Sequence, residues 1–316
     1  MVNDGDFIVH LRSFEGGLEK ATTLGIISPA YHTFHGEGTD SRFYYSYFRS
    51  PKFIDQDLKP HVYGIRDGRS IDIEGMKTIE IPWTSFDEQK AIGDYIDTLD
   101  NLIAIYQHKY EALVAVKKAM LEKMFPKEGK TIPEIRFAGF TDPWEQRKLG
   151  DVCQITMGQS PDGTTYSDVP TDYILVQGNA DLKNGWVCPR IWTTQKTKTA
   201  EAGDLIMSVR APAGAMGKTN YNVVLGRGVA GIKGNEFIYQ TLVKMDEDGY
   251  WKKLAAGSTF ESINSDVISN AEIAVPQDVD EQEKLGAYFS HLDHLITLHQ
   301  RESTYFTGGF YAEQHK

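Results

Sequence analysis

The length of 316 residues favours about two domains, and 41% hydrophobic with 24% charged residues is typical of a soluble globular protein. No apolar run approaches the roughly 18 residues of a membrane span and the first residues lack a signal-peptide pattern, so we expect a cytoplasmic location. The net charge of −11 argues against a non-specific nucleic-acid coat but leaves room for a local basic face. Cys153 and Cys188 form no CxxC pair, and we expect two buried thiols in a reducing compartment.

The first 86 residues are predicted to form a β-rich domain. The stretch "GDFIVHLRSFEGG", from Gly5, alternates apolar and polar residues as a half-buried strand does and then enters a glycine-rich turn. The domain closes on an "EI" strand ending that is followed by Pro82. We therefore assign residues 1–86 to a first domain that precedes a helix.

A long helix is predicted over residues 87–126. Ser85 and Glu88 form a capping-box pattern at its start, and Phe125-Pro126 ends it. Apolar residues recur at four-three spacing over about 50 Å, which is typical of a coiled-coil seam, and Lys117 alone interrupts it. The apolar members of the seam are Ile92, Ile96, Leu99, Ile103, Tyr106, Tyr110, Leu113, Met120 and Met124.

Residues 127–143 are predicted to be a linker into a second domain, residues 144–278. The stretch "FAGFTDPWEQRKLGDV", from Phe137, combines an extended apolar run, a Thr-Asp-Pro turn and a strand-like run. This is the pattern of a domain opening, although it lies near the middle of the chain. We expect Trp144, within this opening, to be exposed.

Short alternating runs separated by turn signals follow in the second domain. Strands are predicted within "YILVQGNADLKNGWV" from Tyr173, "DLIMSVRAPAG" from Asp204 and "NVVLGRGVAGIKG" from Asn222. Helices are predicted for "FIYQTLVKM", from Phe237, and for "GYWKKLAAG". The acidic "KMDEDG" at residues 244–249 lacks the spacing of an EF-hand, so we expect a solvated turn.

Positive charge gathers between Lys183 and Lys233, where eight basic residues face two acids and two tryptophans are interleaved. Lysine and arginine neutralise phosphates, whereas arginine, asparagine and glutamine read base edges. The glycine-rich turn in "SVRAPAGAMGK" lets a backbone approach a phosphate closely. Alone, this pattern fits a solvated loop face as well as a DNA-binding face. The candidate DNA-binding residues are Gln159, Asn179, Lys196, Lys198, Arg210, Lys218 and Arg227.

A second long helix is predicted over residues 279–316, because "DEQEKLGAYFSHLDHLITLHQRE" from Asp280 repeats "DEQKAIGDYIDTLDNLIAIYQHK" from Asp87 at an offset of 193 residues. Asp278 opens its capping-box pattern. We expect Gly308-Gly309 to end this helix early, so that it is the shorter of the two. Its seam residues are Leu285, Phe289, Leu292 and Ile296.

A weaker sequence similarity relates the two β-rich domains. The stretch "GDFIVHLRSFEGG" resembles "GDLIMSVRAPAGA", from Gly203, at an offset of 198 residues. This alignment places Arg12 opposite Arg210 and Lys20 opposite Lys218, so Arg12 and Lys20 are the candidates for a similar role in the first domain. The predicted fold class is α/β (α+β), with two domains in tandem that are each followed by a long helix.

These residues together resemble a known family, the DNA-specificity (S) subunits of type I restriction–modification enzymes. The resemblance rests on "IRFAGFTDPWEQRKLGDV", on "GDLIMSVRAPAG…GRGVAGI", on "GSTFESIN…EIAVP" and on the duplicated "DEQ" helix, and it covers nearly the whole chain. It implies two target-recognition domains that each read half of a split site in double-stranded DNA. The two long helices would pair as an antiparallel coiled coil that separates the domains.

The resemblance also implies partners. The helices of S subunits dock methyltransferase (M) subunits, which carry S-adenosylmethionine, and restriction/translocase (R) subunits complete the enzyme. This chain would then be a non-catalytic recognition subunit with no cofactor of its own. Against the family pattern, Met1 lies opposite roughly Thr199 of the second copy, so the first recognition domain is expected to be partial at its N-terminus.

Other functions have weaker support in the sequence. The stretch "PAGAMGKT" has Pro212 where a P-loop needs glycine, and a strand-like run follows it where a helix is needed. There is no Asn-Pro-Pro-Tyr methyltransferase stretch, and the histidines lack metal-ligand spacing. The alternative that stays open is an S-like protein-interaction module that pairs with subunits without reading a split site.

Overall fold

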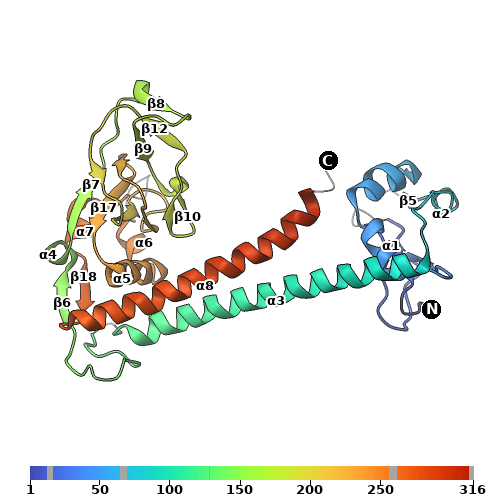
Figure 1. The fold of residues 1–316 in the computed structure, drawn as a ribbon, viewed down its shortest axis with the longest axis horizontal. Helices are drawn as coiled ribbons and strands as arrows, with labels where there is room; N and C mark the ends of the chain where they lie inside the picture. The colour runs from blue at the N-terminus through green and yellow to red at the C-terminus, as the bar shows by residue number, and fades with distance from the viewer. Residues whose placement is uncertain (13–16, 65–69, 128, 256–261, 313–316) are drawn as a thin grey trace. The chain divides into compact units, whose positions relative to one another are not determined.

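The computed structural model describes residues 1–12, 17–64, 70–127, 129–255 and 262–312 (Figure 1). The chain divides into two compact units: unit 1 holds residues 1–106 and 302–316, and unit 2 holds residues 107–301. Two long helices, α3 (Phe86–Met124) and α8 (Val279–Ala312), contribute to both units. Within the described ranges, no helix combines the length and the apolar character that a membrane crossing requires.

Unit 1 is built on a three-stranded antiparallel sheet in the order β2-β1-β3. Alternation along "FIVH" buries Phe7 and Val9 and leaves the residues between them half-buried. A core of aromatic and aliphatic side chains joins the sheet to α1 and the turns after it. The elements are β1 (Phe7–His10), β2 (Glu19–Lys20), β3 (Tyr31–Phe34), α1 (Ser41–Phe48), η1 (Phe53–Leu58), η2 (Lys59–His61), β4 (Val62–Tyr63), β5 (Ser70–Ile71) and α2 (Ile73–Met76).

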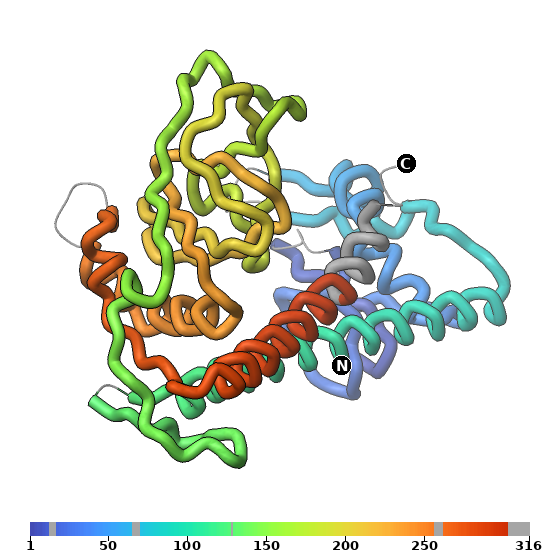
Figure 2. The backbone as a smooth tube through the Cα atoms, turned by 60° about the vertical axis from the view of Figure 1, so that its left-hand side comes forward, coloured from blue at the N-terminus to red at the C-terminus, as the bar shows by residue number. Residues whose placement is uncertain are grey.

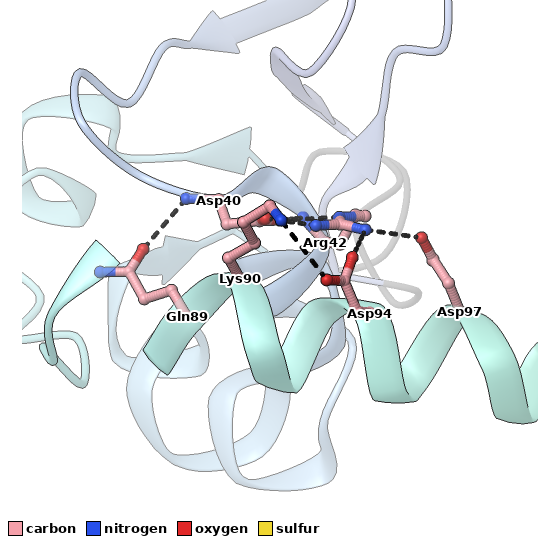
Figure 3. Close-up of polar contacts among 6 residues, drawn as sticks. All are labelled: Asp40, Arg42, Gln89, Lys90, Asp94 and Asp97. Atoms are coloured by element: carbon pink, nitrogen blue, oxygen red, sulfur yellow. Dashed lines mark hydrogen bonds and ion pairs between the residues drawn. The ribbon is translucent and has the colours of Figure 1, made fainter. Parts of the chain in front are cut away.

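Polar contacts fasten α1 to the first turns of α3 (Figure 3). Asp40 caps α1 by accepting the backbone N–H of Arg42 at 2.9 Å, and the Gln89 Oε1 accepts the Asp40 N–H at 3.0 Å. The Arg42 guanidinium then reaches Asp94 at 2.5 Å and Asp97 at 3.2 Å. Its hydrogen bond to Asp40 lowers the pKa of that carboxyl group. The start of α3 is therefore fixed to unit 1 by a charged network.

Unit 2 holds a six-stranded sheet in the order β10-β11-β15-β14-β17-β7, a five-stranded sheet in the order β13-β16-β9-β12-β8, and the pair β18-β6. The strands are β6 (Glu145–Lys148), β7 (Gln154–Met157), β8 (Tyr166–Ser167), β9 (Tyr173–Val176), β10 (Leu182–Lys183), β11 (Trp186–Val187), β12 (Ile191–Thr193), β13 (Thr199–Ala200), β14 (Leu205–Ser208), β15 (Met216–Lys218), β16 (Val223–Leu225), β17 (Val229–Lys233) and β18 (Glu272–Val275).

The two predicted helices of the second domain are present as α5 and α6, and the last two residues of the second prediction, Ala256 and Gly257, lie outside the described residues. The shorter helical elements of unit 2 are α4 (Leu149–Val152), η4 (Gly163–Thr165), η5 (Asn179–Asp181), α5 (Glu236–Glu247), α6 (Tyr250–Ala255) and α7 (Ser265–Ser269). The solvated turn expected at residues 244–249 is wrong for its first four residues, which complete α5. The chain turns only at Gly249, where φ is +72°.

The apolar run of β14 lies between two cores. All four of its residues are buried, and successive side chains of a strand point to opposite faces. Leu205 and Met207 pack into a core shared with the helices, whereas Ile206 packs into a core between the two large sheets. Burial on both faces explains why this strand has a continuous apolar sequence.

The opening of the second domain is anchored in the core that Leu205 and Met207 share with the helices. Trp144 is 2% exposed and packs against Phe125 and Phe237 at ring-centroid distances of 5.8 and 5.6 Å. The expectation of an exposed Trp144 is therefore wrong. The residues that follow it form β6, which pairs with β18 and so carries the indole onto the core.

The sequence similarity between the two β-rich domains is matched by the same strand register in both. The sheet β2-β1-β3 of unit 1 corresponds to β15-β14-β17 of unit 2, with every paired position shifted by 198 residues. The turn before β1 matches as well: the Asn3 N–H donates to the Asp6 carboxylate at 2.7 Å, and the Glu201 N–H donates to the Asp204 carboxylate at 2.8 Å. The matching pairs are Phe7↔Lys20 with Leu205↔Lys218, and Phe7↔Phe34 with Leu205↔Ile232.

Within unit 2, α3 and α8 pair in antiparallel fashion (Figures 1 and 2). The Lys117 Nζ lies 2.6 Å from the Asp293 carboxylate, and the Phe125 and Phe289 rings are 5.8 Å apart, so the residue numbers run in opposite directions. Lys117, the polar break in the predicted seam, is thus matched by an acid on the facing helix. Of the seam residues predicted in the second long helix, Leu285, Phe289 and Leu292 are buried and Ile296 is half-buried.

Of the seam predicted in the first long helix, the residues up to Tyr106 lie in unit 1, and Tyr110, Leu113, Met120 and Met124 lie in unit 2. Ile92 is 36% exposed, and Ile96, Leu99, Ile103 and Tyr106 are half-buried. Off-seam Gly93 is buried and Asp97 and Leu102 are also half-buried, so the exposure of these residues does not by itself trace the predicted four-three spacing.

The predicted end of the second helix is wrong. Gly308-Gly309 do not stop α8, which continues to Ala312 and has 34 residues against 39 in α3. A glycine costs a helix only about 1 kcal/mol relative to alanine, and an established helix propagates cooperatively. The predicted capping boxes are only half formed. Ser85 accepts the Glu88 N–H and Asp278 accepts the Asp280 N–H. The Glu88 carboxylate does not reach back to the Ser85 N–H as a capping box requires, but accepts a hydrogen bond from the Thr84 hydroxyl.

The two cysteines differ in exposure. Cys153 is buried, and burial raises the pKa of its thiol to about 11. Cys188 is exposed, so the expectation that both thiols are buried is wrong for Cys188. Among the described residues, no three His, Cys, Asp or Glu side chains gather as metal ligands would.

Candidate nucleic-acid interface

The turn between β16 and β17 brings loops of both large sheets together. The Gly226 N–H donates to the Val176 carbonyl at 2.7 Å, and the Gln159 N–H donates to the Leu225 carbonyl at 2.8 Å. We call the surface around this turn the Arg227 edge, and it consists of Gln159, Ser160, Gln177, Lys198, Arg210 and Arg227. The side chains of these six residues are exposed, except that of Gln177, which is half-buried.

The six-stranded sheet contributes two arginines from neighbouring strands. The Val209 N–H donates to the Gly228 carbonyl at 2.9 Å, which extends the β14–β17 ladder beyond its last named pair. The next positions on the two strands are Arg210 and Arg227. On the other side of β17, the Arg227 N–H donates to the Ser160 Oγ at 3.1 Å. Three adjacent chain segments therefore end at this edge.

The five-stranded sheet contributes the lysine. The Leu225 N–H donates to the Lys198 carbonyl at 2.7 Å, so Lys198 lies beside the end of β16. The Thr197 hydroxyl donates to the Gln159 carbonyl at 2.7 Å and ties this loop to the end of β7. Lys196, on the same loop, is also exposed.

The loops approach so closely because three positions have no side chain. A Cβ on Gly158 would lie 2.0 Å from the Gly226 carbonyl oxygen, and one on Gly228 would lie 2.0 Å from the Gln177 carbonyl oxygen. A Cβ on Gly226 would lie 3.1 Å from the Gln177 Cα. The glycines on both sides of Arg227 are therefore required for packing between the two sheets.

We expect Gly228→Ala to lower the free energy of unfolding by about 1–3 kcal/mol, because the methyl group would collide with backbone. Urea titration followed by circular dichroism measures the change. Gly163→Ala is the matched control, since nothing lies within 4 Å of its Cβ position, and it should stay within about 0.5 kcal/mol of the parent chain. Equal stability of the two variants would contradict the close approach.

The cations of the basic stretch fall into two groups. Three of them are neutralised by carboxylates: Arg190 by Asp181 at 2.8 Å, Lys218 by Glu236 at 2.9 Å and Lys233 by Glu201 at 2.6 Å. The hydrogen bond from Lys233 also lowers the pKa of the Glu201 carboxyl group. Across the ranges that the structure describes, no carboxylate pairs with exposed Lys183, Lys196, Lys198, Arg210 or Arg227. Lys183 lies on β10, and the other four lie at or beside the Arg227 edge.

The Lys218 side chain is held by contacts within unit 2. Its side chain is 12% exposed, and its Nζ bonds both oxygens of Glu236 while lying 4.8 Å from the Trp186 ring and 4.6 Å from the Tyr239 ring. The Glu236 carboxylate uses two of the three ammonium donors, and the two aromatic rings beside the group leave little of it accessible to a phosphate. These contacts argue against the predicted role of Lys218 in DNA binding.

The same geometry argues against a nucleotide site at "PAGAMGKT". Lys218 ends strand β15, and β16 follows, whereas a P-loop lysine begins a helix. We expect ATP with magnesium to leave the melting temperature of the chain unchanged in a thermal-shift assay. An ATP-dependent rise that Lys218→Ala removes would contradict this assignment.

Asn179 lies on the loop that leaves β9 at the Arg227 edge. It is exposed and begins η5, two residues after Gln177. The buried Asp181 carboxylate orders this loop by accepting the Gln177 N–H at 2.7 Å and two N–H groups of Arg190. The loop is thus held by a side chain that sequence reasoning did not single out.

Unit 1 places its two candidates differently. Arg12 is exposed and follows β1 as Arg210 follows β14, and the Leu11 N–H donates to the Ala30 carbonyl at 2.9 Å as in the second copy. The position that corresponds to Arg227 is Pro29, so the second arginine is replaced. Lys20 is half-buried, and its Nζ lies 5.6 Å from the Tyr45 ring. Arg12 and Lys20 therefore reproduce the positions of Arg210 and Lys218 without an Arg227.

Sequence reasoning missed Ser160 and Gln177. Both lie beside a named candidate, and the available signal was the "GRG" turn, whose glycines indicate that other backbone comes close. The sequence gives no sign of which backbone that is.

Unit 2 combines a two-sheet α/β domain with a cationic loop edge and an antiparallel helix pair, which defines the class as a sheet domain carried on a pair of long helices. The family model for the Type I restriction modification DNA specificity domain matches residues 141–304, more than half of the chain. The chain belongs to this family.

Curated relatives extend the match beyond the domain. The chain is 29% identical over 246 residues to the MjaX specificity subunit of a type I restriction enzyme from Methanocaldococcus jannaschii, covering 74% of this chain and 57% of that protein. It is 23% identical over 256 residues to the MjaVIII specificity subunit of the same organism, covering 73% and 59%. The chain thus spans less than two thirds of these relatives.

Solved structures share the fold. The type I S subunit from M. genitalium matches with a TM-score of 0.68 at 14% identity, over 97% of this chain and 81% of that one. The HsdS subunit from Thermoanaerobacter tengcongensis matches with a TM-score of 0.52 at 22% identity, over 96% and 76%. The predicted architecture of sheet domains with long helices is confirmed.

Proposed function

We propose that this chain is the DNA-recognition subunit of a type I restriction–modification complex and that it reads DNA through the Arg227 edge. The observation that carries the proposal is the cluster of Arg210, Arg227 and Lys198, which have no carboxylate partner among the described residues, around a glycine turn, with Gln159 beside them. Arginine pairs with guanine and glutamine with adenine in the major groove, and lysine neutralises phosphates. Such a surface fits a duplex locally although the chain carries a net charge of −11.

The chain would act without catalytic groups of its own. A methyltransferase subunit would bind the S-adenosylmethionine and carry out the transfer, and a restriction/translocase subunit would complete the complex. The long helices α3 and α8 would serve as the spacer and the docking surface, since the distance between reading domains sets the spacing of half-sites. Exposed acidic residues of α3, such as Asp100 and Glu111, fit protein partners better than DNA.

The test is reconstitution. The chain is co-expressed with a type I methyltransferase subunit, the complex is purified, and the positions methylated in genomic DNA are mapped. We expect a stable complex and a defined methylated sequence that disappears when the chain is left out. A complex that assembles and methylates no defined sequence would contradict DNA reading.

That second outcome is what the alternative function predicts. An S-like interaction module would pair with the subunits without reading a split site. The replacement of the second arginine by Pro29 in unit 1 favours this alternative for the first domain alone. A methylated sequence with one defined half would then separate the roles of the two domains.

A further inference from the structure

The end of the five-stranded sheet at the Arg227 edge includes one more arginine. β16 and β9 are parallel neighbours that both end there, at Leu225 and Val176. β13 and β12 flank this pair and run antiparallel to it, so the residues just before them, Lys198 and Arg190, lie at the same end. Neighbouring strands are about 4.8 Å apart, so Arg190 lies about 10 Å from the strand that leads to Arg227. This span corresponds to about three base pairs of a DNA duplex.

A buried carboxylate orients the Arg190 side chain. Its Nε and Nη2 donate to the same oxygen of Asp181, at 2.9 and 2.8 Å, and the Asp181 side chain is 3% exposed. The other oxygen of Asp181 accepts the backbone N–H groups of Gln177, at 2.7 Å, and Gly178, at 3.3 Å. One carboxylate therefore fixes both the guanidinium and the loop that carries Gln177 of the Arg227 edge.

This pairing leaves one side of the guanidinium available. An arginine side chain has five N–H donors in a planar fork, two on each Nη and one on Nε. Asp181 takes the Nε donor and one Nη2 donor, and among the described residues the Nη1 of Arg190 donates to no acceptor. The Arg190 side chain is 52% exposed. The end of the fork, formed by Nη1 and Nη2, can therefore pair with two adjacent acceptors of a ligand.

The charge balance distinguishes Arg190 from Arg210 and Arg227. Asp181 cancels the charge of Arg190, which weakens its attraction for a phosphate, but the donors at the end of the fork are unaffected. Guanine presents two adjacent acceptors, O6 and N7, in the major groove. A guanidinium that the protein already orients also loses less conformational freedom when it binds. These properties fit a contact to a base better than a contact to the backbone of DNA.

We propose that Arg190, oriented by Asp181, reads a guanine of the recognition sequence through Nη1 and Nη2. This inference rests on the proposed function, since it names a further contact at the same DNA-reading surface. Arg190 is then a specificity-determining residue and Asp181 is a positioning residue. The pair contributes discrimination between sequences without adding net charge to the interface.

The test is the double variant Asp181→Asn with Arg190→Gln in the full chain. The new asparagine can still accept the Gln177 N–H and can donate to the new glutamine, and the net charge stays at −11. We expect the duplex identified by methylation mapping to bind at least about tenfold more weakly in fluorescence anisotropy, because a bidentate contact is lost. Binding of an unrelated duplex should stay within about twofold, with the same dependence on salt.

The matched control is Glu145→Gln with Arg147→Gln. It neutralises another arginine–carboxylate pair of unit 2, on β6, whose arginine side chain is 48% exposed. Both affinities should stay within about twofold of the parent chain. Arg190→Lys covers the case in which the double variant does not fold, because lysine keeps a charged donor for Asp181 but lacks the planar fork. It should lower the ratio of recognition to unrelated binding at least about fivefold.

Guanine substitution identifies the contact itself. Each guanine of the recognition duplex is replaced in turn by 7-deazaguanine, which lacks the N7 acceptor. At one position the replacement should weaken binding by the parent chain about tenfold and should cause no further loss in the Arg190 variants.

The proposal is overturned if the Arg190 variants keep every guanine penalty, or if the recognition and unrelated duplexes lose affinity equally, as a phosphate contact or a disturbed loop would cause. The parent chain separates this inference from the proposed function. A preference of the parent for the recognition duplex that the Arg190 variants retain would overturn this inference alone. A parent without any preference would contradict the proposed function and this inference together.

Discussion

The double variant Arg210→Ala with Arg227→Ala is expected to bind the recognition duplex about 100-fold more weakly than the parent chain. Each bidentate contact to a base contributes about 1–3 kcal/mol, and about 1.4 kcal/mol corresponds to a factor of ten. The two arginines follow neighbouring strands and have no carboxylate partner among the described residues, so their loss is not compensated locally. Fluorescence anisotropy on the duplex identified by methylation mapping measures the change.

Salt dependence separates the two ways in which these arginines can act. If both contact phosphates, the slope of log K against log salt becomes shallower by about two. If they contact bases, the slope is unchanged and discrimination between recognition and unrelated duplexes falls.

The matched control is Lys148→Ala with Lys233→Ala, which removes the same charge from the same unit. Lys233 lies at the opposite end of β17 from Arg227 and pairs with Glu201, and Lys148 bonds to Asn270. We expect affinity within about threefold of the parent chain. Equal losses in both double variants would mean that net charge, not the Arg227 edge, determines binding.

The architecture was predictable because it rests on periodic patterns. Four-three spacing and the repeated "DEQ" start were enough to place both long helices, and the "LIMS" run of β14 was enough to place a strand. The end of α8 was not predictable in the same way. Glycine is a weak signal, and two glycines in a row did not outweigh the continuation of a long helix.

The site was predictable in composition but not in geometry. The stretch rich in lysine and arginine contains the cations of the Arg227 edge, yet composition does not show which of them are paired. Lys218 lies 18 residues from Glu236 in sequence, and only the packing of β15 against α5 brings the two together. Trp144 was misjudged for a similar reason, since the β6–β18 pair that buries it joins residues more than 120 positions apart.

The bidentate pair of Arg136 and Glu281 is the second place where a large effect is expected. Arg136→Met should lower the free energy of unfolding by about 3–5 kcal/mol at neutral pH, measured by urea titration. The reason is that Glu281, 1% exposed, would keep a buried charge without its partner. The pair also holds residues 136–149 against the core of Trp144, so its loss should loosen the opening of the second domain.

Two further variants show whether burial is the cause. Lys127→Met breaks the ion pair with Glu134 in the preceding linker, where both side chains are more than half exposed, and should cause no measurable loss of stability. The double variant Arg136→Met with Glu281→Leu removes both buried charges and should recover most of the loss, because no unpaired charge remains. If Arg136→Met alone were as harmless as Lys127→Met, the segment would not be clamped to α8.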